Sequence, residues 1–378
     1  LLDGEKMASL CREFGISRKT GYKIFNRYKD EGLRGLEDRD RSPYRHPNRL
    51  PFQVETAILR IKREHMSWGA PKIREKLIKL HPAIKPPATS TIHATLDRHG
   101  LVKRRKRRRY KAEGTALSNA RVPNALWCAD YKGQFRLGNR RYCYPLTVSD
   151  YRSRYLLACE GLESTREAGA FPVFERVFRE FGLPAAIRTD NGVPFASPHA
   201  LFGMSRLAVW WLRLGIAIER IKPGHPQQNG RHERMHLTLK QETTRPPAYN
   251  FLQQQARFDD FIKGYNQDRP HQALGGKYPG EVYTPSAREY HHPEVPEYPF
   301  HDRTIQVTQC GRICIGRRKI NLCTVFGGQY VGIREDADQV WLVSFMVYDL
   351  GFFDQDENRV EPVGHNPFAP KVLPMSSE

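Results

Sequence analysis

The feature that most constrains the fold is a change in the spacing of apolar residues at Trp127. From there, three segments of strand-forming residues follow closely on one another, at residues 126–135, 143–150 and 154–161. Helices and strands are then expected to alternate. The expected helices lie over 165–181, about 199–214, about 228–243 and 250–266, and the expected strands over 185–192 and 216–221. Pro172 should lie near the start of the first of these helices or kink it. Three antiparallel strands followed by this alternation predict an α/β core with a mixed sheet.

Residues 6–30 are expected to form two short helices separated by the turn F-G-I-S. Two apolar stripes support them: Met7, Leu10 and Phe14, then Tyr22, Phe25 and Tyr28. A Gly-containing turn before a helix that is basic at its start is typical of a helix-turn-helix, whose second helix enters the major groove of DNA. An ordinary helical hairpin is the alternative. Ser17 suits an N-cap, and the residues expected to meet DNA are Ser17, Arg18, Lys19, Thr20 and Lys23.

Helices over 54–64, 68–80 and 90–100, the last capped near Ser90, predict a second helix-turn-helix unit. A basic run follows, which we interpret as an arm that tracks phosphates, with nuclear localisation as the alternative: Lys103, Arg104, Arg105, Lys106, Arg107, Arg108 and Arg109. Beyond residue 300 only short strands are expected, which predicts a small β-barrel or sandwich. The expected domains are a helix-turn-helix module at 1–33, a linker at 34–51, a second module at 52–102, a basic linker at 103–122, the catalytic core at 123–290, a small β-barrel at 300–360 and a tail at 361–378.

The net charge of +20 is concentrated at one end of the chain. Residues 1–110 hold 28 Lys and Arg against 12 Asp and Glu. The positive electrostatic potential of such a region attracts a polyanion, and nucleic acid is the usual one. An anionic membrane is the alternative, but the sequence has no amphipathic anchoring helix, no span-length apolar run and no signal peptide at its start. The seven cysteines form no C-x-x-C pair, so we expect reduced, mostly core thiols and a cytoplasmic protein.

Three carboxylates stand out. Asp130 interrupts an apolar strand, Asp190 ends a strand before an Asn-Gly turn, and Glu233 lies near a helix start after P-G-H-P-Q-Q-N-G. A carboxylate in an apolar strand is costly to bury unless it is paired, hydrogen-bonded or bound to a metal. Oxygen ligands of this kind suit Mg²⁺, and two such ions can assist phosphodiester displacement. Asp150 is the rival to Asp130, and we place it in the supporting structure.

The segments W-C-A-D-Y-K-G, R-T-D-N-G and H-P-Q-Q-N-G-R-H-E-R resemble the catalytic core of retroviral integrases and bacterial insertion-sequence transposases, the DDE superfamily. The segment Y-N-Q-D-R-P-H-Q-A-L and the paired N-terminal modules are similar to those of insertion-sequence transposases. The spacing from Asp190 to Glu233 is longer than the family's usual one, and an insertion around residues 197–206 would account for it.

This resemblance implies a ribonuclease-H-like core with two Mg²⁺ ions, for which Mn²⁺ substitutes. Asp130 would bind both ions, Asp190 one of them and Glu233 the other. The implied reactions are cleavage at the terminal inverted repeats of a mobile element, exposing a 3′-hydroxyl, and transfer of that end into target DNA. A homo-oligomer on DNA and a bacterial, nucleoid-associated location follow, with residues 226–230 as a mobile loop. Four residues are expected as phosphate contacts or as solvated surface groups: Lys222, His225, Arg231 and Lys240.

Residues 232–236 also spell H-E-x-x-H, the signature of zinc proteases. A third ligand is missing at the expected spacing beyond His236, and a protease leaves the basic N-terminal third unexplained. We therefore expect His232 and His236 to be neighbours on a helix surface. Two further alternatives remain: a ribonuclease-H-type nuclease, which does not need tandem DNA-reading modules, and a DNA-binding regulator that has lost catalysis.

Overall fold

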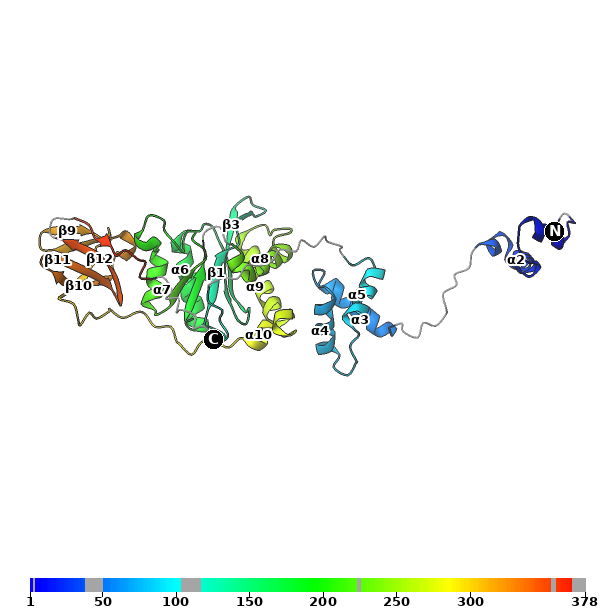
Figure 1. Ribbon diagram of the computed structural model, residues 1–378, viewed down its shortest axis with the longest axis horizontal. Coiled ribbons are helices and arrows are strands. Elements are labelled where there is room, and N and C mark those ends of the chain that lie inside the picture. The colour runs from blue at the N-terminus through cyan, green and yellow to red at the C-terminus, as the bar shows by residue number, and fades with distance from the viewer. Residues whose placement is uncertain (3, 38–49, 103–116, 223–225, 355–357, 369–378) are drawn as a thin grey trace. The chain divides into compact units, whose positions relative to one another are not determined.

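The computed structural model describes residues 1–2, 4–37, 50–102, 117–222, 226–354 and 358–368 (Figure 1). The chain divides into two compact units, Leu1–Thr56 and Ala57–Glu378. Across the described residues, no helix is long and apolar enough to cross a membrane.

The first unit contains the two expected helices, α1 (Met7–Glu13) and α2 (Arg18–Glu31), followed by the 3-10 turn η1 (Gly32–Leu36). Ser17 caps α2 as predicted, because its side chain accepts a hydrogen bond from the backbone N–H of Thr20 at 3.1 Å. The two helices pack closely at Gly21, where a Cβ atom would collide with the sulfur atoms of Cys11 and Met7.

The predicted apolar stripes of this unit are partly wrong. Phe14 is 70% exposed and Tyr22 is 53% exposed, whereas Cys11 and Gly21 are buried between the helices. The contact therefore forms through small residues, which allow a closer approach of the two backbones than aromatic rings would.

Three helices follow as predicted: α3 (Phe52–Glu64), α4 (Ala70–Leu80) and α5 (Thr89–Arg98). They enclose a small apolar core made of Ile58, Ile61, Ile73, Leu77, Ile92 and Leu96. Ser90 does not cap α5. The helix begins one residue earlier, and Ala88 takes the capping position without a side-chain bond.

The predicted mixed sheet is present. Its strands are β1 (Trp127–Tyr131), β2 (Phe135–Arg136), β3 (Tyr142–Asp150), β4 (Leu156–Leu162), β5 (Ala186–Thr189) and β6 (Ala217–Arg220). They lie in the order β2-β3-β1-β5-β6, with β4 paired to β3. The pairs β1–β3 and β3–β4 are antiparallel, and β1–β5 and β5–β6 are parallel. The expected meander and the later parallel strands thus join in a single sheet.

Four helices flank this sheet: α6 (Glu167–Phe181), α7 (Arg206–Arg213), α8 (Gly230–Thr243) and α9 (Phe251–Gln267). Figure 1 shows α6 and α7 on one side of it and α8 and α9 on the other. One core includes Phe174, Phe178 and Trp211 from α6 and α7, and the other includes Leu239 and Phe258 from α8 and α9. Both faces of the sheet are therefore covered.

Two expectations for these helices need correction. Pro172 lies inside α6 and not near its start, so the helix lacks one backbone hydrogen bond there. The helix expected from residue 199 begins at Arg206, where Ser205 caps it by accepting a hydrogen bond from Ala208 N at 3.1 Å. The preceding residues instead form the 3-10 turn η2 (Leu201–Gly203).

The C-terminal region follows the short helix α10 (Pro279–Val282). Its strands are β7 (Arg303–Gln306), β8 (Arg312–Ile315), β9 (Arg318–Asn321), β10 (Tyr330–Ala337), β11 (Val340–Phe345), β12 (Tyr348–Asp354) and β13 (Glu361–Pro362). The expected barrel is not what the described strands form: β13-β12-β11-β10-β7 make an open sheet, and β8–β9 a separate hairpin. Closure depends on strand tilt and register, which strand spacing alone does not specify.

The cysteines follow the expectation in part. The structure leaves all seven free of disulfides: Cys11, Cys128, Cys143 and Cys159 are buried, whereas Cys310 and Cys314 are exposed and Cys323 is partly exposed. The prediction of core thiols therefore fails in the C-terminal region, where small sheets leave more residues at the surface.

Candidate active site

Asp130 lies in β1, in the middle of the mixed sheet. Its neighbours Trp127 and Ala129 point into the core against α6 and α7, so strand alternation places Asp130 on the opposite face, toward α8. Its side chain is 21% exposed. Burial raises the pKa of Asp130 to about 7, and the negative charges of Asp190 and Glu233 add to the rise.

Asp190 directly follows β5, which runs parallel to β1. The Asn-Gly turn after it holds the carboxylate in place. Gly192 donates its backbone N–H to Asp190 Oδ1 at 3.1 Å, and the Asn191 amide donates to the carbonyl of Ile221 at 2.7 Å. The turn that the sequence indicated is thus tied to the end of the neighbouring strand β6.

Glu233 lies in the first turn of α8, with its side chain exposed. The preceding 3-10 turn η3 (Pro226–Asn229) is fastened through Gln228, whose side-chain oxygen accepts the Lys222 N–H at 2.8 Å. Residues 226–230 thus have a fixed point at Gln228. Their mobility stays a prediction.

The electrostatics of the three carboxylates suit a divalent cation. Each added negative charge makes ionisation of Asp130 harder, and Lys132 is the cation that acts in the opposite direction. Hard oxygen ligands carrying uncompensated charge are the donors that Mg²⁺ prefers. Within the described ranges, however, no group of three or more His, Cys, Asp and Glu side chains is close enough to hold a metal ion as it stands.

Asp150 has a structural environment. It is 1% exposed, and its two oxygens accept hydrogen bonds from Ser153 N at 2.7 Å, Ser153 Oγ at 2.6 Å and Asn124 N at 2.7 Å. These bonds hold the turn after β3 and the segment before β1. This environment supports the placement of Asp150 outside the reactive set.

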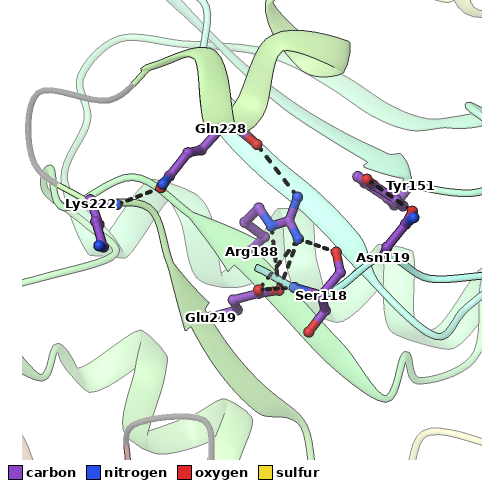
Figure 2. Close-up of polar contacts among 7 residues, drawn as sticks. All are labelled: Ser118, Asn119, Tyr151, Arg188, Glu219, Lys222 and Gln228. Carbon is purple, nitrogen blue, oxygen red and sulfur yellow. Dashed lines mark hydrogen bonds and ion pairs between the residues drawn. The ribbon is translucent and has the colours of Figure 1, made fainter. Parts of the chain in front are cut away.

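The sequence patterns missed a buried ion pair beside the carboxylates. Arg188 of β5 and Glu219 of β6 are cross-strand partners, 1% and 3% exposed, with Nη2 and Oε2 3.2 Å apart. Figure 2 shows that both side chains bond to the backbone of Ser118. The Ser118 N–H donates to Glu219 Oε1 at 2.6 Å, and the Ser118 carbonyl accepts from Arg188 Nη2 at 2.5 Å. Arg188 also donates to the Gln228 carbonyl at 3.5 Å.

This pair links the start of the core to the turn before Glu233. It also positions Tyr151, whose ring lies 4.9 Å from the Arg188 guanidinium carbon. A signal was available in the sequence, because A-I-R-T and I-E-R each place a charged residue inside an apolar strand. Their opposite charges become meaningful only once the two strands are known to be adjacent and in register.

Most of the predicted DNA contacts that the structure describes are exposed. On α2 these are Arg18, Lys19 and Lys23, and in the core they are Lys222, Arg231 and Lys240. Ser17 and Thr20 are exposed but bonded to each other, Oγ to Oγ1, at 2.8 Å. Arg231 donates to the Tyr151 carbonyl at 3.2 Å and its guanidinium carbon lies 4.0 Å from the Tyr151 ring. His225 and the basic run from Lys103 to Arg109 lie outside the described residues.

Lys132 is a further candidate that sequence reasoning did not single out. It is half-buried beside Asp130, and burial together with the charge of Lys240 lowers the pKa of Lys132. Lys132 is thus a positive charge placed between Asp130 and Lys240.

The expectation for the histidines of H-E-x-x-H is wrong. His232 and His236 do not lie on the helix surface but on the buried face of α8, 2% and 7% exposed. Both Nε2 atoms lie 2.7 Å from the hydroxyl of Thr147, so these two nitrogens face the sheet and do not converge on an open metal position. The buried stripe of α8 includes them because they lie two turns before Leu239 and Thr243 on the same face.

Comparisons with known families agree with this architecture. Two family models described as integrase core domains match residues 120–226 and 214–279, and a homeodomain-like model of the helix-turn-helix type matches residues 20–96. The first two matches together include Asp130, Asp190 and Glu233.

The curated relatives include two insertion-element proteins. One, from insertion element IS476 of Xanthomonas euvesicatoria, is 26% identical over 285 residues, which cover 72% of this chain and 77% of the relative. The other, from insertion element IS407 of Burkholderia multivorans, is 27% identical over 214 residues, covering 54% and 73%. Among solved structures, a chain of the simian T-cell lymphotropic virus intasome in complex with PP2A regulatory subunit B56 gamma is 15% identical with a TM-score of 0.39, covering 82% of this chain and all of that one. The HTLV-2 integrase catalytic core, solved with magnesium, is 16% identical with a TM-score of 0.34, covering 43% and 97%.

The mixed sheet, the integrase core matches and the helical N-terminal region define a transposase or integrase of the DDE superfamily. Within it, the chain belongs with the bacterial insertion-sequence transposases that carry an N-terminal helix-turn-helix. Its helix-turn-helix and integrase domains make it a DNA-binding protein.

Proposed function

We propose that this chain binds the ends of its own mobile element, cleaves the DNA there to expose 3′-hydroxyl ends, and transfers those ends into target DNA with two Mg²⁺ ions per active site. The observation that supports the proposal is the raised pKa of Asp130, about 7, which is caused by burial together with the negative charges of Asp190 and Glu233. A bound cation would relieve the cost of ionising this buried acid.

Asp130, Asp190 and Glu233 would hold the ions, and Mn²⁺ is expected to substitute. When bound, the ions supply the positive charge that stabilises the attacking and leaving oxygens of the phosphodiester. Because the three acids do not stand at metal spacing, metal binding is expected to draw them together. Lys132, half-buried beside Asp130, would hold a DNA phosphate near the acids, and the Gly192 N–H that donates to Asp190 Oδ1 would keep that carboxylate oriented.

The other parts of the chain would recognise the substrate. The exposed basic start of α2 would enter the major groove of the element end, and the basic run at 103–109 would follow the backbone. Two ends must be joined in one reaction, so we expect a homo-oligomer on DNA. Action on DNA in a bacterial cell places the protein in the cytoplasm, at the nucleoid.

The test uses duplexes taken from the DNA on each side of the reading frame, a target plasmid, and Mg²⁺ or Mn²⁺. Nicked ends and joined products are expected with the full chain. Asp130→Asn, Asp190→Asn and Glu233→Gln should each abolish joining while DNA binding persists. Glu163→Gln is the matched control, because Glu163 is an exposed acid paired with Arg141 and should leave joining unchanged. Normal joining by any of the three variants would refute the site assignment.

A second candidate is a DNA-binding regulator that derives from a transposase and has lost catalysis. The spacing of the three acids favours it, since they do not form a ready metal site. The same experiment separates the two candidates. A regulator would bind the flanking duplexes but give no nicked or joined products with either metal.

A further inference from the structure

A layer of four polar side chains lies between α8 and the sheet, directly beneath the proposed active site. His232 and His236 project from α8, and Thr147 and Ser149 project from the facing side of β3. All four are buried. The neighbouring β3 residues Leu146 and Val148 belong to the core on the other side of the sheet, which accounts for the alternation along this strand.

The contacts within this layer converge on one hydroxyl. Thr147 Oγ1 lies 2.7 Å from His232 Nε2, 2.7 Å from His236 Nε2 and 3.0 Å from the main-chain carbonyl of Asp130. Ser149 Oγ lies 2.9 Å from His232 Nδ1. The histidines of α8 are therefore joined through a single hydroxyl to the residue that carries the first carboxylate.

Proton counting assigns the direction of each of these bonds. A threonine hydroxyl donates one hydrogen and accepts two, and a carbonyl can only accept. Thr147 therefore donates to the Asp130 carbonyl, and both histidines donate their Nε2–H to Thr147. His232 Nδ1 then carries no proton and accepts from Ser149. A neutral imidazole carries one ring proton, so a ring that donates from Nε2 has an unprotonated Nδ1.

The same assignment leaves His236 Nδ1 without a proton. This atom lies 3.8 Å from Asp130 Oδ2, which is beyond hydrogen-bonding distance. His236 therefore does not form an ion pair with Asp130.

The first turn of α8 depends on this layer. In that turn, His232 is the buried side chain, whereas Arg231 and Glu233 are exposed. The N-terminal residue Asn229 makes no side-chain capping bond to the helix. Met235 and Leu239 add apolar contacts on the same buried face, so His232 and His236 supply the polar contacts that fix the rotation of the helix near Glu233.

We propose that His232, His236 and Thr147 are positioning residues that lock the first turn of α8 to β3 and β1, and so hold Glu233 in place relative to Asp130. This proposal rests on the proposed function for the role of the two acids. The motif H-E-x-x-H then has a role without zinc: its histidines face the sheet and orient the glutamate between them. A fully paired polar layer specifies one register of helix on strand, which an apolar contact of the same size does not.

The decisive variant is Thr147→Val, which keeps the shape of the side chain and removes the shared acceptor. Its matched control is Thr243→Val, at the far end of the same helix, which removes a buried hydroxyl that donates to Leu239 O at 2.8 Å. Thr147→Ser restores the hydroxyl. Joining of the flanking duplexes is measured against Mg²⁺ concentration, at a temperature where every variant is folded.

Thr147→Val is expected to need at least about tenfold more Mg²⁺ for half-maximal joining, with unchanged affinity for the duplexes. Thr147→Ser should stay within about threefold of the original protein, and Thr243→Val should show the original Mg²⁺ dependence. Equal Mg²⁺ dependence for Thr147→Val and Thr243→Val would overturn the proposal.

A second measurement does not depend on activity or on the stability of the valine variant. Nitrogen-15 spectra of histidine-labelled protein report which ring nitrogen carries the proton, and His232→Gln and His236→Gln assign the two signals. At pH 7 both rings should be neutral with the proton on Nε2. A proton on Nδ1 of either ring would contradict the network itself, whereas an absence of joining by the original protein would contradict only the proposed function.

Discussion

Replacement of Asp130 by Asn should make the metal-free protein more stable while it abolishes catalysis. The ionised carboxylate is disfavoured in the folded chain by burial and by its two acidic neighbours, and these effects raise its pKa from 3.8 to about 7. An amide of nearly the same shape carries no charge and escapes both penalties.

The size and the pH range of the effect follow from that shift. About three pKa units correspond to at most about 4 kcal/mol, at about 1.4 kcal/mol per unit. The side chain is 21% exposed and its neighbours can relax, so we expect about 1–2 kcal/mol. Because the folded-state pKa is raised above the unfolded one, stability contributed by this group is present below about pH 4 and is lost as the pH rises to about 7.

The assay is differential scanning calorimetry with EDTA at pH 5 and pH 8. At pH 8 the Asn variant should unfold roughly 2–8 °C higher than the original protein, and at pH 5 the difference should shrink. Saturating Mg²⁺ should stabilise the original protein and not the variant. The control Asp150→Asn should destabilise at both pH values, since Asp150 accepts three hydrogen bonds. A variant that is less stable than the original at pH 8 in EDTA would refute this reasoning.

Three other outcomes are expected. The double substitution Arg18→Ala and Lys23→Ala should weaken binding to the flanking duplexes by about tenfold and should make the binding constant less dependent on salt. Titrations at several salt concentrations measure both effects. Unchanged affinity would exclude α2 as the helix that reads the DNA. Glu219→Ala leaves the buried Arg188 guanidinium unpaired and should lower the free energy of unfolding, measured in urea, by about 3–5 kcal/mol, whereas Glu219→Gln should lower it less. Equal urea midpoints for the Ala variant and the original protein would show that the pair does not stabilise the core. Gly21→Ala should speed amide exchange in α1 and α2 because its Cβ collides with sulfur atoms of α1, whereas Gly264→Ala, with open space around it in α9, should be neutral or stabilising.

Much of the molecule follows from local patterns. Strand and helix positions in the core were predictable because periodicities of two and 3.6 residues reflect which face of each element is buried. Local patterns singled out each of the three acids: a charge in an apolar strand, an acid before Asn-Gly, and an acid at a helix start. Their role as one site stays a prediction. The helix cap at Ser17 was predictable because capping involves only neighbouring residues.

What the sequence by itself determined is therefore local: the order of the elements, the concentration of charge in the first third, and the identity of the acids. Only the tertiary structure decided which faces meet. His232 and His236 look like surface residues until α8 is placed on β3, where Thr147 receives both. Arg188 and Glu219 become a pair only when β5 and β6 are in register. The physical reason is that burial and hydrogen-bond pairing between distant segments depend on helix rotation and strand register, which no short stretch of sequence specifies.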